Sequence, residues 1–141
     1  MMTPEEMKRR TKDFALRIIR LVNALPKARV AGTIGGQLLR AGTSVGSNYR
    51  AASRARSQAD FIAKMGIVEE EADESLFWME ILVEAGLMKG QLLAKLRKEG
   101  DEILSMAVSS INTARGGPRA RRKGNSAVRN PQSAINEHPS G

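Results

Sequence analysis

The chain has 141 residues, of which 41% are hydrophobic and 27% charged, and a formal net charge of +8, which fits one domain with a core of its own. It has no cysteine, and its one histidine, His138, lies near the end in a Pro/Asn/Ser segment, so no disulfide, metal site, cofactor or histidine catalysis is expected. No apolar run approaches the roughly 20 residues of a membrane span and the chain starts with charges, which predicts a cytoplasmic protein without a membrane or secretory segment.

The first predicted helix starts at Thr3. Thr3, Pro4 and Glu6 together form a capping box with a proline at the first helical position. Apolar residues then recur at helical spacing until Pro26 ends the helix, and they are Met7, Phe14, Ile18, Leu21 and Leu25.

A second helix is predicted from about residue 28 to residue 54. It is rich in small residues, so it can approach its neighbours closely. Each glycine costs a helix roughly 1 kcal/mol relative to alanine. We therefore expect this helix to depend on packing for its stability and to have irregular first turns.

Two further helices follow. Ser57 and Asp60 form a second cap, and a helical apolar pattern continues from Phe61 to a stop at Gly86. The last predicted helix covers about residues 89 to 113, with an apolar stripe of Leu92, Leu96, Ile103, Met106 and Ile111.

Short connections favour antiparallel neighbours, so the predicted fold is an all-α, antiparallel up-down-up-down four-helix bundle over residues 1–114. Residues 115–141 have no apolar face and are predicted to be a disordered basic tail.

The charge is distributed unevenly along the chain. Residues 1–56 carry 12 Lys or Arg and 3 Asp or Glu, a net charge of +9. Residues 57–113 carry 5 and 11, a net charge of −6, and the tail from residue 114 carries 6 and 1, a net charge of +5. The first two helices are therefore basic and the third is acidic.

This asymmetry has two interpretations. Opposite charges on neighbouring helices can simply set pairing and solubility, at about 0 to 1 kcal/mol for each exposed pair. Alternatively, the cations form a surface for nucleic-acid phosphates, assisted by the tail. The candidate binding residues are Lys8, Arg9, Arg10, Arg17, Arg20, Arg50, Arg54, Arg56, Arg119, Arg121, Arg122 and Lys123.

Catalytic and metal chemistry find little support. The acidic helix suggests a di-iron bundle, but the Glu-x-x-His motif is missing. Glu70 and Glu74 are one turn apart and could share a cation, although salt bridges to Arg50 or Arg54 are favoured over that. We assign no catalytic residue and no metal ligand.

Ser44 and Asn48 lie one turn apart on a face of small residues. We interpret them as a buried polar pair that fixes helix register by hydrogen bonds to a neighbouring helix or to Glu74. Direct contact of this pair with a ligand is the alternative.

From Ser44 to Gly86 the sequence resembles the family of small four-helix bundle proteins encoded in 23S rRNA intervening sequences. That family also includes the accessory variability protein of diversity-generating retroelements. The matching residues in this stretch are Ser44, Asn48, Tyr49, Arg56, Ser57, Phe61, Glu74 and Gly86. The last predicted helix adds Glu102, Ile103 and Met106 in similar positions. Departures are Ala51-Ala52, where the family commonly has Glu-Gly, and Glu70-Glu71, where it has a small Gly-Ser pair.

The resemblance implies a bacterial four-helix protomer that assembles into a barrel-shaped homopentamer. For the retroelement member it implies binding of nucleic acid and of a reverse transcriptase. The leading hypothesis is therefore a non-catalytic homo-oligomeric scaffold that binds structured nucleic acid and acts as an accessory to a reverse transcriptase. RNA is favoured over DNA as the nucleic acid. The alternative is a protein-interaction adaptor that binds no nucleic acid.

Overall fold

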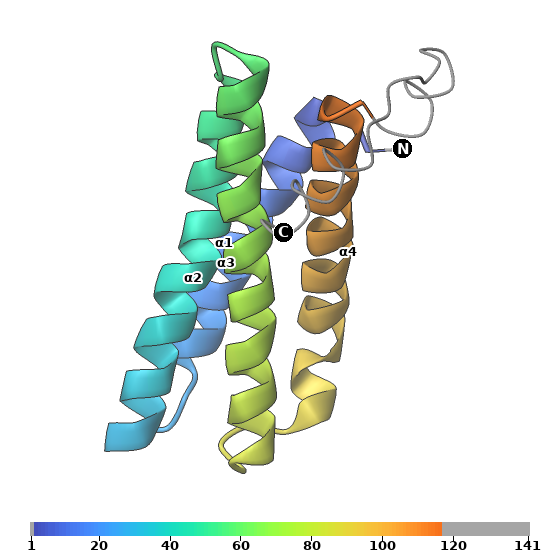
Figure 1. The fold of residues 1–141 in the computed structure, drawn as a ribbon. Helices are drawn as coiled ribbons and strands as arrows, with labels where there is room; N and C mark the ends of the chain where they lie inside the picture. The colour runs from blue at the N-terminus through green and yellow to red at the C-terminus, as the bar shows by residue number, and fades with distance from the viewer. Residues whose placement is uncertain (1, 117–141) are drawn as a thin grey trace, which may run out of the picture.

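Four helices make up nearly all of residues 2–116, the part of the chain that the computed structural model describes. They are α1 (Pro4–Asn23), α2 (Arg29–Ser53), α3 (Gln58–Glu84) and α4 (Gly90–Ala114). Each helix packs against the next one, α4 returns to contact α1, and successive helices run in opposite directions (Figure 1). The all-α, up-down-up-down prediction is thus confirmed, and the predicted helix boundaries agree to within about two residues.

The helix ends follow the local chemistry of the sequence. The Thr3 hydroxyl accepts a hydrogen bond from the Glu6 amide at 3.1 Å, and the Glu6 carboxylate accepts one from the Thr3 amide at 2.9 Å. The Ser57 hydroxyl caps α3 by accepting from the Asp60 amide at 3.0 Å. Just after α3, Gly86 has a φ of 74°, a left-handed conformation that glycine adopts without a steric penalty. Both predicted caps and the predicted stop are therefore present.

Helix α2 differs from prediction at its start. It is regular from Arg29 onward, although no side chain caps it. Ala31, Ile34 and Leu38 are buried against the core from the first turns, so packing offsets the low intrinsic helix propensity of the glycines. The expected irregular turns are absent from this described helix.

The core is built from the predicted stripes with one register correction. Phe14, Ile18, Met65 and Ile103 are fully buried. In α4, however, Leu92 is 68% exposed and Leu93 is 1% exposed. Leu92 was the wrong choice: both leucines are at helical spacing from Leu96, and the packing of α4 against its neighbours places Leu93 in the core.

Helices α1 and α2 approach each other closely because α2 has glycines on the shared face. A Cβ atom at Gly46 would lie 3.2 Å from the Thr11 carbonyl oxygen, which belongs to the α1 backbone. At Gly42 a Cβ would overlap the Ile18 side chain. The small-residue face therefore brings the α1 and α2 backbones together.

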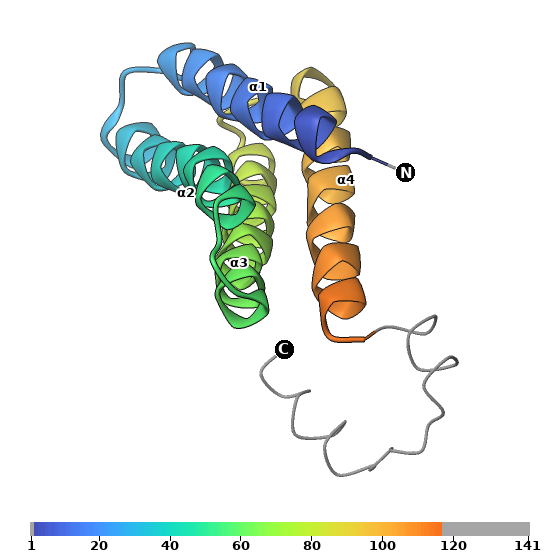
Figure 2. The same cartoon turned by 90° about the horizontal axis from the view of Figure 1, so that it is seen from above.

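In the view from above, the chain passes round the bundle in the order α1, α2, α3, α4 (Figure 2). Helices α1 and α3 are diagonal to each other, and their backbones are not in contact. The basic first helix and the acidic third helix thus lie on different sides of the bundle. Most of the predicted tail, from residue 117 on, lies outside the described residues.

Candidate nucleic-acid interface

A groove follows the outer side of the α1–α2 contact, with a volume of about 670 Å³. Its floor is formed at Gly46, where the two backbones approach each other. We call it the α1–α2 groove, and its lining residues are Glu5, Lys8, Arg9, Lys12, Ala15, Thr43, Gly46, Ser47, Arg50 and Arg54.

The groove is strongly cationic. Lys8, Arg9 and Lys12 come from α1, and Arg50 and Arg54 come from the end of α2 and its cap. Within residues 2–116, none of these five cations has a carboxylate within 4.0 Å. Glu5 is the one acidic residue in the lining. The groove therefore carries a net positive charge that no described carboxylate neutralises at ion-pair distance.

Four of the predicted cations, Lys8, Arg9, Arg50 and Arg54, lie together in the groove. Sequence reasoning missed Lys12. The spacing could have indicated Lys12 as a lining residue, because Lys8 and Lys12 are four residues apart and so lie on the same face of a helix.

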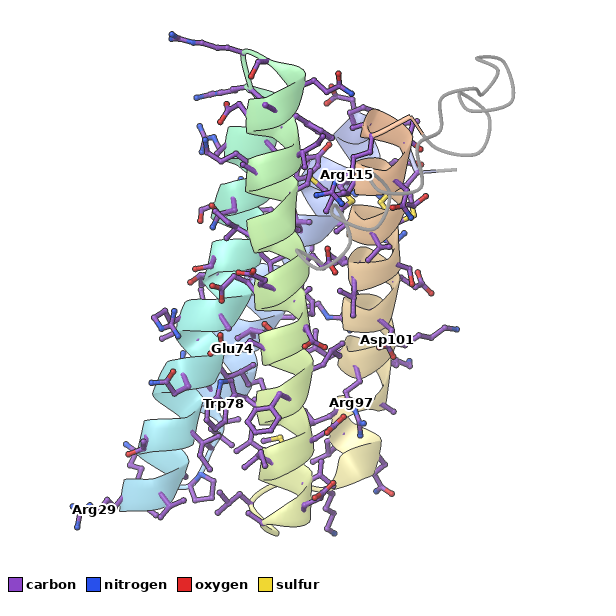
Figure 3. All side chains as sticks on the ribbon, in the orientation of Figure 1. Arg29, Glu74, Trp78, Arg97, Asp101 and Arg115 are labelled. Carbon is purple, nitrogen blue, oxygen red and sulfur yellow. The ribbon has the colours of Figure 1, made fainter. Side chains whose placement is uncertain are left out.

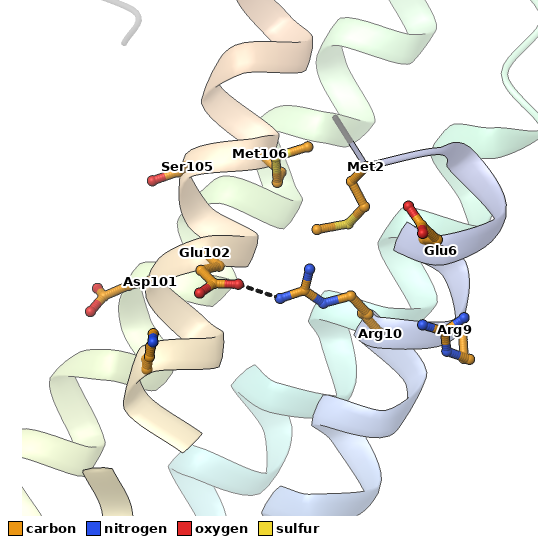
Figure 4. A pocket seen from close by; sticks show the side chains of 9 residues that line it. Met2, Glu6, Arg9, Arg10, Asp101, Glu102, Ser105 and Met106 are labelled. Atoms are coloured by element: carbon orange, nitrogen blue, oxygen red, sulfur yellow. Dashed lines mark hydrogen bonds and ion pairs between the residues drawn. The ribbon is translucent and has the colours of Figure 1, made fainter. Parts of the chain in front are cut away.

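Arg10 faces away from the groove, although its sequence neighbour Arg9 lines it. Its guanidinium donates two hydrogen bonds to the Glu99 carboxylate on α4, at 2.8 and 2.6 Å. It donates a third to Glu102, which Figure 4 shows as a dashed line. These bonds raise the pKa of Arg10 and lower the pKa of the Glu99 carboxyl. Arg10 therefore ties α1 to α4, and its donors already have partners.

The other predicted cations are dispersed. Arg17 is half-buried and near enough to Glu99 to lower the pKa of that carboxyl further. Arg20 and Arg56 are exposed but do not line the groove. Arg119, Arg121, Arg122 and Lys123 lie outside the described residues.

The predicted polar residues make local contacts. The Asn48 amide donates to the Ser44 carbonyl on its own helix at 2.9 Å, instead of to a neighbouring helix. The Glu74 carboxylate accepts from the Trp78 indole at 3.0 Å and from Arg40 at 3.2 Å. Figure 3 labels Glu74 and Trp78 on α3. The predicted salt bridge from Glu74 to Arg50 or Arg54 is wrong. The antiparallel pairing of α2 with α3 places Arg40 beside Glu74 instead.

Metal sites and membrane-spanning helices are the two remaining classes of feature. No group of three or more His, Cys, Asp or Glu side chains within residues 2–116 is placed to hold a metal ion. Among the four described helices, none has the length and apolar character that crossing a membrane requires.

Comparison with known proteins identifies the family. The family model described as 23S rRNA-intervening sequence protein matches residues 5–109. A similar fold is found in a crystal structure from Bacteroides thetaiotaomicron VPI-5482, described as a protein with unknown function from the S23 ribosomal protein family. That protein is 33% identical, the match covers 78% of this chain and 98% of the other, and the TM-score is 0.73. A search of curated proteins finds no significant match. Since the family model covers all but the first residues of the bundle and the end of α4, the chain belongs to the family of 23S rRNA-intervening sequence proteins.

Proposed function

We propose that this protein is a non-catalytic helical scaffold that binds structured RNA through the α1–α2 groove. The observation that carries the proposal is the set of five cations from two helices, none paired with a carboxylate of the described residues. Accumulated cations of this kind attract polyanions and release their condensed counterions on binding.

The spacing of the cations suits a phosphate backbone. Lys8 and Lys12, like Arg50 and Arg54, are four residues apart, which is about 6 Å along a helix. Two such rows face one groove, so they can contact successive phosphates. The groove lining contains no aromatic side chain on which a base could stack. Binding is therefore expected to depend on shape and charge more than on base sequence.

RNA is preferred over DNA as the ligand because the family takes its name from an intervening sequence of 23S rRNA. The tail residues Arg119, Arg121, Arg122 and Lys123, which lie outside the described residues, would add phosphate contacts of their own. Accessory action beside a reverse transcriptase follows from the resemblance to the retroelement member. The absence of cysteine suits a cytoplasmic scaffold.

Assembly into a ring of about five protomers is also part of the proposal, and the resemblance alone supplies the number. Such a ring would present several α1–α2 grooves at once and so raise the affinity for a long RNA. Light scattering at micromolar protein concentration and moderate salt tests the assembly. A monomeric mass would remove the ring and leave each groove to act singly.

The test of RNA binding compares two variants with the same change in charge. Lys12→Glu/Arg50→Glu alters the groove, and Arg20→Glu/Arg56→Glu alters exposed cations outside it. We expect the wild type to bind a structured RNA more weakly as salt rises, with a steep slope. The groove variant should lose at least about tenfold in affinity, and its salt slope should fall by about 2, one for each phosphate contact removed.

The control variant should lose clearly less affinity than the groove variant, and circular dichroism should show that both remain helical. If the wild type binds no RNA at low salt, or if both variants lose the same amount, the α1–α2 groove is not the binding site. The adaptor hypothesis would then take its place, with the cations serving to pair with protein partners.

A further inference from the structure

Helix α3 is apolar on two faces. One face packs into the core through residues such as Met65, Val68 and Met79. The opposite face exposes Ile67 and Phe77, which are 37% and 48% accessible to solvent. A surface helix usually has one apolar stripe, so the second set of large apolar side chains needs a separate explanation. We call this second surface the outer face of α3, formed by Ile67, Glu70, Asp73, Phe77, Glu80 and Glu84.

Phe77 is held in a fixed position. Its ring packs edge-on against Trp78, with ring centroids 4.9 Å apart and an interplanar angle of 71°. Trp78 is itself fixed by the hydrogen bond from its indole to Glu74, which also pairs with Arg40. An exposed aromatic ring on a rigid support loses little conformational entropy when a partner covers it.

The carboxylates around Phe77 set the sign of the charge that a partner must carry. Helix α3 contains eight acidic residues and one lysine. Within residues 2–116, Glu70, Asp73 and Glu84 have no cation within 4.0 Å. Glu80 has only a long contact with Arg97, at 3.9 Å. The outer face of α3 thus combines apolar anchors with unneutralised negative charge.

We propose that the outer face of α3 binds a cationic amphipathic helix of another protein. Ile67 and Phe77 are ten residues apart, which is about 15 Å along the helix. A matching partner presents two apolar anchors at that separation on one face, with Lys or Arg side chains between them for Glu70 and Asp73. Recognition of this kind uses apolar anchors for affinity and the charges for orientation.

A second copy of the chain fits this surface less well. The exposed apolar residues of α1, Leu16 and Ile19, are only three residues apart, or about 4.5 Å. Those of α4, Leu92 and Val108, are sixteen residues apart, or about 24 Å. Neither separation matches about 15 Å, and α3 of a second copy, which has the matching spacing, carries the same negative charge and would repel this surface.

The position of this surface also permits simultaneous binding of two ligands. Helix α3 is diagonal to α1 in the bundle, so its outer face is directed away from the α1–α2 groove (Figure 2). A cationic protein on α3 and an anionic ligand in the groove would not obstruct each other. The bundle could thus join a basic protein to an RNA, although the α3 contact does not depend on the RNA.

The test uses a designed probe, a synthetic helical peptide with leucines eleven residues apart, about three turns or 16.5 Å along one face, and lysines between them. The control peptide has the same composition with the leucines on opposite faces. Trp78 is the one tryptophan of the chain, so its emission reports whether the peptide binds beside Phe77. Affinity is measured by the anisotropy of a label on the peptide.

Three protein variants locate the contact. We expect Phe77→Ser and Glu70→Gln/Asp73→Asn each to weaken binding of the probe at least about fivefold, the equivalent of about 1 kcal/mol. Asp13→Asn/Asp101→Asn removes two exposed carboxylates from α1 and α4 and should leave the affinity within about twofold. Circular dichroism verifies that every variant is folded.

The proposal is overturned if Trp78 emission does not respond to the probe, if the control peptide binds equally well, or if the two double variants lose equal affinity. It is also overturned if sedimentation shows self-association that Glu70→Gln/Asp73→Asn abolishes, because a second copy would then occupy the face. RNA binding is measured separately on the same proteins. A protein that binds the peptide without binding RNA would sink only the proposed function.

Discussion

Arg10 on α1 and Glu99 on α4 are joined by two hydrogen bonds, at 2.8 and 2.6 Å, across the weakest contact between neighbouring helices of the bundle. The Glu99 side chain is only 18% exposed, so its charge depends on Arg10 for compensation. Replacing Arg10 by Met should lower the free energy of unfolding at neutral pH by about 1 to 2 kcal/mol, between the values for exposed and buried ion pairs. Urea denaturation measures it.

The same pair predicts a pH dependence. The pKa of Glu99 is lowered in the folded state, so its stabilising contribution is present above the unfolded pKa, near 4.5, and is lost as pH falls through the folded pKa. The stability difference between wild type and Arg10→Met should therefore shrink in acid. The matched control, Arg20→Met, removes an exposed cation from the same helix and should change stability by no more than about 0.5 kcal/mol at any pH. A difference that stays constant down to pH 3 would contradict the prediction.

Glu71 on α3 should show the opposite behaviour. Its Oε1 atom is buried and has no hydrogen-bond partner among the described residues, and burial together with Glu74 raises the pKa of its carboxyl. A raised carboxyl pKa means that the charged form destabilises the fold above that pKa, whereas below the unfolded pKa both states are neutral. Glu71→Gln should therefore stabilise the protein at pH 7 by about 0.5 kcal/mol, since solvent around a half-buried group screens part of the effect.

Thermal melts at pH 7 and pH 3.5 check this expectation. The gain from Glu71→Gln should disappear at the lower pH. Glu70→Gln changes the exposed neighbour on the same helix and serves as the control. Equal gains from both substitutions would mean that reduced helix charge, and not the buried oxygen, explains the effect.

Gly42→Ala tests the close packing of α1 on α2. An added methyl would overlap the Ile18 side chain, which is fully buried and cannot move into solvent. Overpacking of this kind costs about 1 to 3 kcal/mol. Gly36→Ala is the matched control in the same helix, because nothing lies within 4 Å of a Cβ there. It should be neutral or stabilising by up to about 1 kcal/mol, and urea denaturation separates the two results.

Removal of the residues after Gly116 should leave the bundle folded. The last buried residue of α4 is Ile111, and the helix ends at Ala114. A segment as poor in apolar residues as 117–141 offers little burial to offset its ordering entropy. Helical circular dichroism and a cooperative melt should both persist after the truncation. Loss of either would place the end of the domain beyond residue 116.

Local patterns in the sequence predicted the helices well, because caps and stripes depend on residues within one or two turns. Thr3, Ser57 and Gly86 each act as the pattern indicated. The choice between Leu92 and Leu93 failed because both suit an apolar stripe and only the register of the neighbouring helix distinguishes them. Periodicity alone does not encode that register.

Which residues of different helices lie together was the part of the candidate site that the sequence predicted least well. Arg9 and Arg10 are adjacent in sequence, yet one lines the groove and the other bonds to α4. Arg40 was not considered as the partner of Glu74 because a sequence separation of 34 residues gives no local signal. Charge totals thus located the basic side of the bundle, and three-dimensional packing decided which cations remain available.

The contact of Ile18 with Gly42 couples the packing of the core to the separation of α1 and α2. Ile18 is a core residue, but its side chain also limits how near α2 can come to α1, the two helices that line the cationic groove. A larger or smaller side chain at residue 18 would move Arg50 and Arg54 relative to Lys8 and Lys12 without changing any charge. Under the proposed RNA binding, selection on the spacing of the groove cations would therefore also act on Ile18, a residue that lies outside the groove lining.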